Sequence, residues 1–428
     1  MSSQPSRFAR HRHWHLLLSP LSISLFGYSI IMFIVALGDA VMAYSAPVYI
    51  ESFVGSPFYM GLLLASSSVV GFIADVVIGK IFGNKNYYFF LFWTIIIGLS
   101  FPLSLLTLPP LIPLFLLAMS SWGIYFELME FSSFHFVSEV ERRLDNAKSW
   151  GTIYSFKSCA YLVGPLIASF LIASDTKFPF LAATLFFLFS LLASLFFHLT
   201  LGRKVHPHLP PPPPKRTILD EFIIWRLLFR HVWPVWLFTL TAIMVDATFW
   251  SVGTLLSEEL KSSHPFGGWL ITAYMAPNLL AIILVQRAAR WGKRHIAFLT
   301  GIISGLFLFV AGFTTSTPLL LLFVFISSFF SGIAVPEILA ASEDYITRLR
   351  GLGNDMIALE RTASSLAYII GPILAGAFAG VVGNQRTLSL VGLVSTTLAV
   401  AILIATPRKI LLPQKALSQL EEKLKLVK

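Results

Sequence analysis

Five acidic residues lie within long apolar stretches of this sequence: Asp39, Glu127, Glu130, Asp246 and Glu337. A charged group at the centre of a bilayer costs at least about 2.5–3.5 kcal/mol on insertion scales, so each carboxyl requires a proton, a partner or a watery cavity. A carboxyl that binds a proton on one side of a membrane and releases it on the other can couple proton flow to solute movement. The alternative is that these acids are buried, satisfied residues with no role in transport.

Two basic residues lie at depths similar to those of the acids. We predict that Lys157 pairs with Glu127 or Glu130, which lie one turn apart on one helix face, and that Arg361 pairs with Glu337. The other interpretation of Arg361 is that it is simply the basic end of its helix. Five acids against two bases predict that at least one carboxyl is protonated part of the time, since desolvation and like charge both raise a carboxyl pKa.

Three aromatic residues near these acids, Trp122, Tyr125 and Trp250, are candidates for stacking on a substrate, with bulk packing as the alternative. We find no catalytic Ser/His/Asp arrangement and no metal-ligand cluster in the sequence. The two Gly-Lys pairs lack the spacing and the Ser/Thr of a Walker motif. The sequence therefore predicts no metal, no cofactor and no enzymatic activity, with a proton gradient as the expected driver and sodium as the alternative.

The composition indicates the elements that must position these residues. The chain is 56% hydrophobic and only 12% charged, whereas soluble proteins carry roughly a quarter charged residues. A membrane-spanning helix needs about 20 apolar residues, and twelve stretches qualify. They lie at 22–45, 56–79, 87–107, 112–137, 151–174, 179–201, 232–256, 266–287, 295–315, 317–341, 356–380 and 387–406. The predicted fold class is an all-α integral membrane protein.

The distribution of Lys and Arg predicts the orientation of these helices. The basic residues gather at the two termini and in every second connection, while the opposite connections carry only Lys177, Lys261 and Arg386. The positive-inside rule therefore places both termini in the cytoplasm of a multi-pass protein in a cell (inner) membrane. The net charge of +10 is then mostly a topology signal. The expected partner is the lipid bilayer, and no nucleic acid binding is expected.

The sequence also repeats itself. The string "AYLVGP" at residue 160 returns as "AYIIGP" at residue 367, a shift of 207 residues. Asp39 and Asp246 have the same spacing, and so do Gly61 and Gly268. Two looser matches, at shifts of 209 and 204, keep the same order along the chain. We infer two pseudo-symmetric six-helix bundles.

Each repeated string carries a mid-helix Gly-Pro pair, Gly164–Pro165 in the first half and Gly371–Pro372 in the second. Proline breaks a soluble helix, but membrane helices tolerate it because their neighbours satisfy the freed backbone groups. Small residues let helices approach closely, and Gly-Pro lets a helix bend. We therefore predict a packing and hinge element in each half.

The expected organisation has four parts. Residues 1–201 form the first bundle, and residues 202–231 form a cytoplasmic linker with five prolines, 210–214, followed by an interfacial helix. Residues 232–406 form the second bundle, and residues 407–428 form a cytoplasmic tail.

This pattern resembles the major facilitator superfamily (MFS) of secondary transporters. The resemblance rests on the six-plus-six repeat, the cytoplasmic termini, the long central loop and basic Gly-containing turns after the second and eighth helices. It implies a substrate site near mid-membrane between two halves that rock to give alternating access. It also implies that helices 1, 4, 7 and 10 line a cavity and that helices 3, 6, 9 and 12 face lipid. The five acids lie on the first group, and the second group has no Asp, Glu, Lys or Arg within the ranges above.

Two family motifs match in part. The cytoplasmic gating turns are represented by Asp75, Gly83, Lys85, Arg290, Gly292, Lys293 and Arg294. The family motif has an acidic residue in each turn. When the first turn is aligned at Gly83, Lys80 replaces this acid, and Ala289 replaces it in the second turn. The helix 5 string is similar to the Gly-x-x-x-Gly-Pro-x-x-Gly-Gly motif of proton-driven exporters, with small residues replacing three glycines.

These observations predict a monomeric MFS-type secondary transporter that moves a small organic solute, coupled to H⁺. Export of a cationic or neutral amphiphile is favoured, because the predicted cavity is acidic and aromatic. The alternatives are proton-linked uptake of a sugar or other neutral metabolite and, in a different class, a non-transporting membrane receptor or membrane enzyme.

The predicted orientation can be tested with single cysteines in a Cys159→Ala background. Pro211→Cys, in the linker, and Leu420→Cys, in the tail, should react with an impermeant thiol reagent only from the cytoplasmic face. Labelling of either cysteine from the outside would overturn the orientation.

Overall fold

Twelve membrane-length helices build the protein in a computed structural model, which describes residues 20–83, 85–140, 146–200, 218–288, 292–348 and 353–406. The first half contains α2 (Pro20–Val54), α3 (Pro57–Phe82), α4 (Tyr87–Thr107), α5 (Ile112–Val140), α6 (Asn146–Ile172) and α7 (Phe178–Thr200). In the second half, the seventh helix comprises α8 (Ile218–Thr248), the π-helix η3 (Phe249–Gly253) and α9 (Thr254–Ser263). It is followed by η4 (Gly267–Trp269), α10 (Leu270–Ala288), α11 (Lys293–Ala311), α12 (Thr317–Arg348), α13 (Gly353–Val382) and α14 (Asn384–Ala405). The predicted all-helical, twelve-helix fold is confirmed.

Short turns separate consecutive helices, and their residues explain the boundaries. Gly55, with φ 62°, adopts the left-handed conformation that ends α2, and Pro57 then begins α3 in the first turn, where no backbone donor is needed. Asn86 caps α4 by accepting a hydrogen bond from the Phe89 amide at 3.0 Å. Gly383, with φ 87°, separates α13 from α14.

The seventh helix begins earlier than the apolar pattern predicts. We expected a separate interfacial helix before residue 232, but α8 runs from Ile218 to Thr248 as one helix. Buried apolar residues such as Ile224 and Leu228 pack into the second-half core, so the segment is held by packing rather than by a membrane surface. The proline run 210–214 and the tail 407–428 lie outside the described residues.

Eleven helices in the described part of the chain have the length and hydropathy needed to cross a membrane. The remaining one, α10, includes residues 282–288, whose side chains the structure does not describe. Helix α7 presents Phe189, Leu192, Phe196 and Leu199 on one face, each at least 60% exposed. Exposure of such an apolar face to water would be unfavourable, so the face indicates contact with lipid, as predicted for helix 6.

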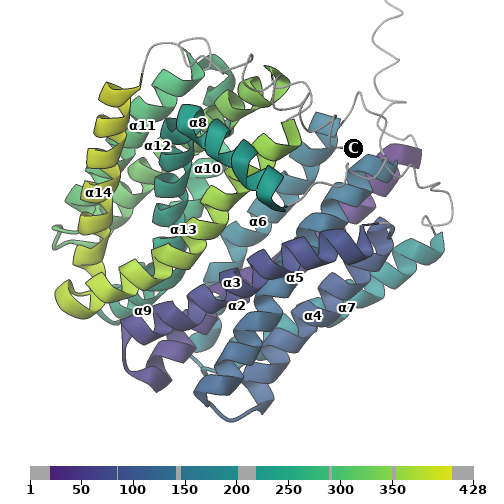
Figure 1. The fold of residues 1–428 in the computed structure, drawn as a ribbon. Coiled ribbons are helices and arrows are strands. Elements are labelled where there is room, and N and C mark those ends of the chain that lie inside the picture. The colour runs from purple at the N-terminus through teal and green to yellow at the C-terminus, as the bar shows by residue number, and fades with distance from the viewer. Residues whose placement is uncertain are drawn as a thin grey trace, which may run out of the picture.

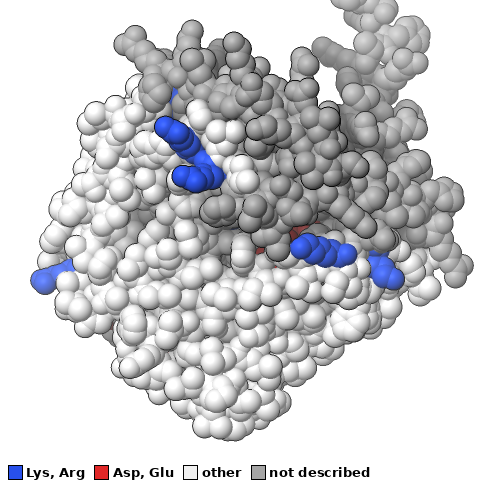
Figure 2. All heavy atoms as spheres, in the orientation of Figure 1, with Lys and Arg blue, Asp and Glu red and all other residues white. Residues whose placement is uncertain are grey.

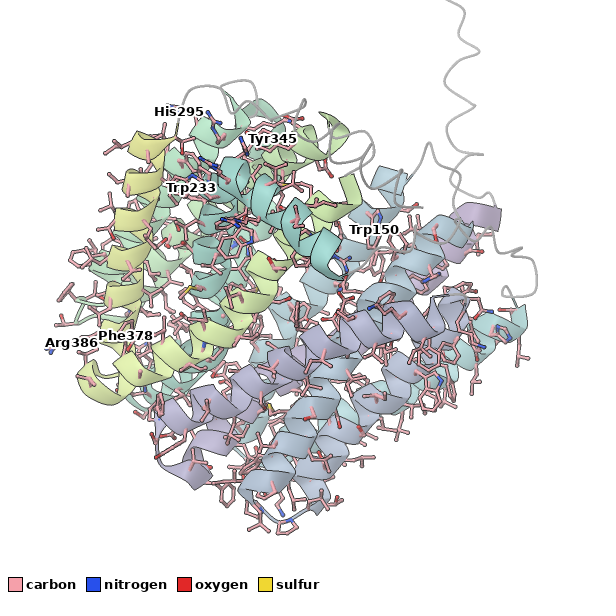
Figure 3. The ribbon with its side chains drawn as sticks, in the orientation of Figure 1. Trp150, Trp233, His295, Tyr345, Phe378 and Arg386 are labelled. Atoms are coloured by element: carbon pink, nitrogen blue, oxygen red, sulfur yellow. The ribbon has the colours of Figure 1, made fainter. Side chains whose placement is uncertain are left out.

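The two halves lie side by side in Figure 1, the first half in purple to blue and the second in green to yellow. We call the end where α2 begins and α14 ends the inner end, after the predicted orientation, and the opposite end the outer end. Figure 3 labels His295 and Tyr345 at the inner end and Arg386 at the outer end. Across the boundary between the halves, α3 packs along α13 and α6 packs along α10.

Charged side chains are sparse on the outside of this bundle. On the face drawn in Figure 2, described Lys and Arg residues stand singly among uncharged residues, and acidic atoms show only in a small patch. Asp39 and Glu337 are each 1% exposed, so any partners of these two acids must be found among neighbouring helices.

The repeated glycines bring helices into close contact within each half. A Cβ added at Gly164 of α6 would lie 2.4 Å from Cβ of Ala40 on α2. In the second half, a Cβ added at Gly371 of α13 would lie 2.8 Å from Cβ of Ala247 on α8. Both partner alanines directly follow the repeated aspartates. The close-packing role of the Gly-Pro strings is thus visible in both halves, and the hinge role stays a prediction.

Adding one methyl group tests this contact. Gly164→Ala should lower the free energy of unfolding by about 1–3 kcal/mol, because the close-packed interface must shift to admit the new atom. The matched control is Gly151→Ala in the same helix, where a Cβ meets nothing within 4 Å, and helix propensity predicts no loss of stability there. Thermal unfolding in detergent measures both, and equal midpoints for the two variants would contradict the packing role.

Candidate functional site

The first-half aspartate lies in a buried polar contact between three helices. Asp39 on α2 is 1% exposed. Its Oδ1 accepts a hydrogen bond from Nε1 of Trp122 on α5 at 2.7 Å, and its Oδ2 accepts one from the hydroxyl of Tyr161 on α6. The carboxyl is therefore satisfied by neutral donors from two neighbouring helices.

The second-half aspartate has the same kind of environment. Asp246 on α8 accepts hydrogen bonds from the hydroxyl of Tyr274 on α10, at 2.9 Å, and from the hydroxyl of Tyr368 on α13. Tyr161 and Tyr368 each follow their aspartate by 122 residues. The Asp–Tyr contact is thus built twice, by the same positions of the repeat.

The repeat places the two aspartates at equivalent positions of the first and seventh helices, and that they face each other across a cavity stays a prediction. No hydrogen bond joins them in the described part of the chain. An aromatic contact links them instead, because the ring of Tyr161 packs edge-on against Trp250 with centroids 5.6 Å apart. Trp250 lies in η3, four residues after Asp246. The route from Asp39 to Asp246 therefore passes through Tyr161 and Trp250.

The structure separates the three aromatic residues proposed for stacking. The indole N–H of Trp122 donates to Asp39, and its ring stacks on Phe101 with centroids 5.1 Å apart. Both the donor and one ring face of Trp122 are therefore occupied by protein contacts. Tyr125 is fully buried within the first half, where its hydroxyl lies 3.4 Å from Sδ of Met129. Tyr125 is a core residue in this structure, which corrects its placement beside a substrate. Trp250 lies at the boundary between the halves.

A second group of charges lies nearer the inner end. Nζ of Lys157 donates to Oε1 of Glu130 at 2.8 Å, so Glu130 rather than Glu127 is the residue paired with this lysine. Glu127 lies against α3, since its Oε1 would be 3.4 Å from a Cβ added at Gly71. Nζ of Lys157 also lies 5.4 Å from the centre of the Tyr154 ring.

The predicted pair between Glu337 and Arg361 is wrong. Arg361 instead forms an ion pair with Asp75 on α3 of the other half, with NH1 3.9 Å from Oδ1. The physical reason is that α13 packs along α3 across the boundary between the halves, which turns its inner charge away from α12. Glu337 is 1% exposed, and neither of its carboxylate oxygens has a hydrogen-bond partner among the described residues.

The gating turns make different contacts from those implied by the family motif. In the second half, Lys293 pairs with Asp344 of α12 at 2.9 Å, and Arg294 lies 3.5 Å from the Tyr345 hydroxyl. Gly292, with φ 95°, makes the turn before α11.

In the first half, α3 ends before Gly83, whose backbone is right-handed, and Nζ of Lys85 lies 5.8 Å from the Phe89 ring. Asp75 lies within α3 and faces Arg361. Arg290 lies outside the described residues.

Comparisons with known proteins agree with this architecture. A family model described as Major Facilitator Superfamily matches residues 235–426. The fold is similar to a crystal structure of a bacterial homologue of the human lysosomal transporter Spinster, with a TM-score of 0.68 and 14% identity over 90% of this chain and 96% of that chain. No curated protein sequence matches the chain significantly.

Two further solved structures share the fold. The peptide transporter POT in complex with sulfate has a TM-score of 0.72 and 12% identity over 90% of this chain and 94% of that chain. The nucleoside transporter NupG has a TM-score of 0.67 and 13% identity over 90% of this chain and 100% of that chain. The family model thus covers the second half of the chain, and the solved transporters share the twelve-helix fold over about nine-tenths of its length.

Our sequence reasoning missed the tyrosines that hold the two aspartates. Tyr161 and Tyr368 were present in the repeated strings themselves, and the shift of 207 residues that they share with Asp39 and Asp246 could have identified them. Tyr274 has no tyrosine at the equivalent first-half position, where Ser67 stands. No sequence signal points to that third donor.

The Lys157–Glu130 pair can be tested with a double-mutant cycle. Lys157→Ala should destabilise the protein by up to about 3–5 kcal/mol, because it leaves a carboxylate unpaired in a low-dielectric site. The double variant Lys157→Ala/Glu130→Gln should be milder than Lys157→Ala alone. Lys157→Ala/Glu127→Gln is the matched control and should give no such recovery. Unfolding in detergent measures all four, and additive effects for Lys157 and Glu130 would show that they do not act as a pair.

Proposed function

We propose that the protein is a proton-coupled MFS transporter that exports a cationic or neutral amphiphilic solute, with Asp246 and Asp39 as the carboxyls that couple the two flows. One observation carries this proposal. In the described part of the chain, the hydrogen bonds to either aspartate come from Tyr and Trp side chains, which are neutral. Lys157 lies one turn before Tyr161 on α6, but its ammonium is paired with Glu130.

Neutral donors make a buried carboxylate less unfavourable, but they do not cancel its charge. A carboxyl in this position is neutralised by a proton or by a cationic substrate. If the two compete for the same carboxyl, release of one allows binding of the other. Competition of this kind supplies the link between proton flow and substrate movement that a secondary transporter needs.

The two aspartates differ in how closely they are enclosed. Asp39 is 1% exposed, whereas Asp246 is half-buried and its partner Tyr368 is 36% exposed. A substrate entering between the halves therefore reaches Asp246 more readily than Asp39. Asp246 is our first candidate for the exchange between proton and substrate.

The surroundings of Asp246 favour a solute with positive charge and apolar bulk. Trp250, Tyr274 and Tyr368 place aromatic rings around this carboxyl. Aromatic faces attract cations, with Trp the most effective, and the same rings bind uncharged apolar groups. The similar structures include a peptide transporter and a nucleoside transporter, so the shared fold does not select the cargo and these side chains must do so.

The orientation and assembly follow from the charge pattern. The excess of Lys and Arg at the inner end favours cytoplasmic termini in a cell inner membrane. The internal duplication supplies both halves of the expected transport pathway within one chain, which favours a monomer as the working unit.

Substitution of asparagine for aspartate tests the coupling role. Asn keeps the shape of Asp and much of its hydrogen bonding but cannot bind or release a proton. In proteoliposomes, Asp246→Asn should abolish transport of tetraphenylphosphonium driven by a pH gradient, together with its binding, because the cation loses its counter-charge. For a neutral substrate found in a panel of sugars, nucleosides and uncharged amphiphiles, the same variant should lose gradient-driven accumulation but retain substrate-for-substrate exchange.

Tyr368→Phe is the matched control, since it removes one hydroxyl from the same carboxyl but leaves the titratable group in place. It should reduce gradient-driven transport without abolishing it, and Asp39→Asn measures the role of the other half. If both Asn variants concentrate substrate at the wild-type rate under a proton gradient, the coupling site lies elsewhere, with Glu127 or Glu130 as the next candidates. A wild-type protein that responds to sodium but not to protons would contradict the choice of ion.

A further inference from the structure

A polar cluster joins the two halves at the outer end of the molecule. Oε1 of Glu258 on α9 accepts hydrogen bonds from the Tyr44 hydroxyl of α2, at 2.6 Å, and from the Ser169 hydroxyl of α6, at 3.0 Å. The Tyr44 hydroxyl also lies 2.9 Å from Oγ of Ser257, the residue before Glu258. One carboxyl of the second half thus contacts two helices of the first half.

This cluster is well enclosed. Tyr44 and Ser257 are 0% exposed, and the Glu258 side chain is 19% exposed. Hydrogen bonds to a charged acceptor contribute more than those between neutral groups, typically about twice as much. The contacts of Glu258 are therefore among the stronger polar contacts between the halves.

Lys261, one turn further along α9, adds a second contact from the same helix. Its ammonium donates to the Ser169 carbonyl and lies 3.4 Å from Oε2 of Glu258. Ser169 belongs to the last turn of α6, which ends at Ile172, and carbonyls in a last turn have no donor within their own helix. A cation there also interacts favourably with the negative end of the helix dipole. This role explains why one of the few basic residues at the outer end is present.

Small residues let the helices approach closely enough for these contacts. A Cβ added at Gly268, between α9 and α10, would lie 2.5 Å from Oγ of Ser169. On the other side of the boundary, a Cβ added at Gly376 of α13 would lie 2.2 Å from the Pro57 carbonyl oxygen of α3. The outer ends of the two halves are therefore in direct contact at two separate places.

The π-helix η3 determines which way Glu258 points. Glu258 follows Asp246 by twelve residues, which in a regular α-helix would place it about 120° away around the helix axis. A π-turn contains one more residue than an α-turn. With one residue absorbed in η3, the angle falls to about 20°, so Glu258 lies on nearly the same face of the helix as Asp246.

The repeat supplies a natural comparison. Glu51 lies 207 residues before Glu258 and twelve residues after Asp39, but α2 is α-helical throughout this stretch. Glu51 therefore lies about 120° around the helix from Asp39. Its side chain makes no hydrogen bond to another residue in the part of the chain that the structure describes. The same acid at the same repeat position lacks the inter-half contact where the π-turn is missing.

We propose that Glu258 is a positioning residue of the transport cycle, which holds the outer end closed by binding Tyr44 and Ser169 and must release both when that end opens. This inference does not depend on which ion or solute is carried, since alternating access requires the outer ends to separate in any case. Among the described residues nearer the inner end, the ion pair between the halves is longer, because NH1 of Arg361 lies 3.9 Å from Oδ1 of Asp75 and the Arg361 side chain is 58% exposed.

Distance measurements between spin labels test this proposal on the full chain. Labels at Ser174→Cys and Ser263→Cys, in a Cys159→Ala background reconstituted in lipid nanodiscs, report the separation of exposed positions on the outer ends of the two halves. Glu258→Gln should raise the ratio of outer-open to outer-closed molecules at least about tenfold, because it removes the charge from these hydrogen bonds. Tyr44→Phe keeps the ring and should shift the ratio in the same direction by a smaller factor.

Glu51→Gln is the matched control and should leave the distance distribution at that of the parent. The thermal midpoint of each variant separates a general loss of stability, which would not change the outer distances, from release of this contact. A Glu258→Gln distribution equal to that of the parent would overturn the proposal, and so would an equal shift in Glu51→Gln. Tyr44→Phe provides an independent reading if Glu258→Gln does not fold.

Discussion

Each half of this protein encloses one aspartate and satisfies it with the hydroxyl of a tyrosine from the helix packed against it. Donors directed at a carboxyl at this depth offset part of its desolvation cost. The neighbouring helix must therefore lie close enough, and in the right register, to supply one. The glycine one turn after each tyrosine meets this requirement, because Gly164 lies against Ala40 and Gly371 lies against Ala247. The Gly-Pro string thus serves the carboxyl as well as the packing.

The surroundings of Asp39 and Asp246 share the tyrosine contact but differ in their other residues. The second donor to the aspartate is an indole on α5 in the first half and a phenol on α10 in the second. Only the second aspartate is followed by a π-helix, which turns Trp250 toward Tyr161 and Glu258 toward the first half. Duplication therefore supplies a pair of equivalent carboxyls, and later divergence gives them different surroundings. Such a difference is what a carrier needs if one carboxyl is to meet the substrate while the other remains enclosed.

Charged contacts at the outer end differ in kind from those at the inner end. At the outer end, Glu258 and Lys261 join the halves through short contacts from a single helix. At the inner end, Lys157 and Glu130 pair within the first half, and Lys293 and Asp344 pair within the second. Contacts across the boundary must break and re-form during rocking, whereas contacts within a half can persist. Among the described residues, the shortest polar contacts between the halves that we find are those of Glu258 and Lys261 at the outer end.

The sequence by itself determined the class of protein, the twelve helices, the duplication and the two aspartates at its centre. These follow from hydrophobic run length and from a repeat, which are local properties of the chain. The contact between Lys157 and one of two glutamates was also predictable, because it joins adjacent helices at similar depth. The tertiary structure alone decided that Arg361 faces Asp75, that Tyr125 is core, and that Glu258 joins the halves. Each of these depends on the rotation of a helix about its axis and on which helix of the other half it meets. Each residue turns an α-helix by about 100°, so the one extra residue of a π-turn changes the direction in which all later side chains point. The apolar pattern of the sequence does not reveal such a turn.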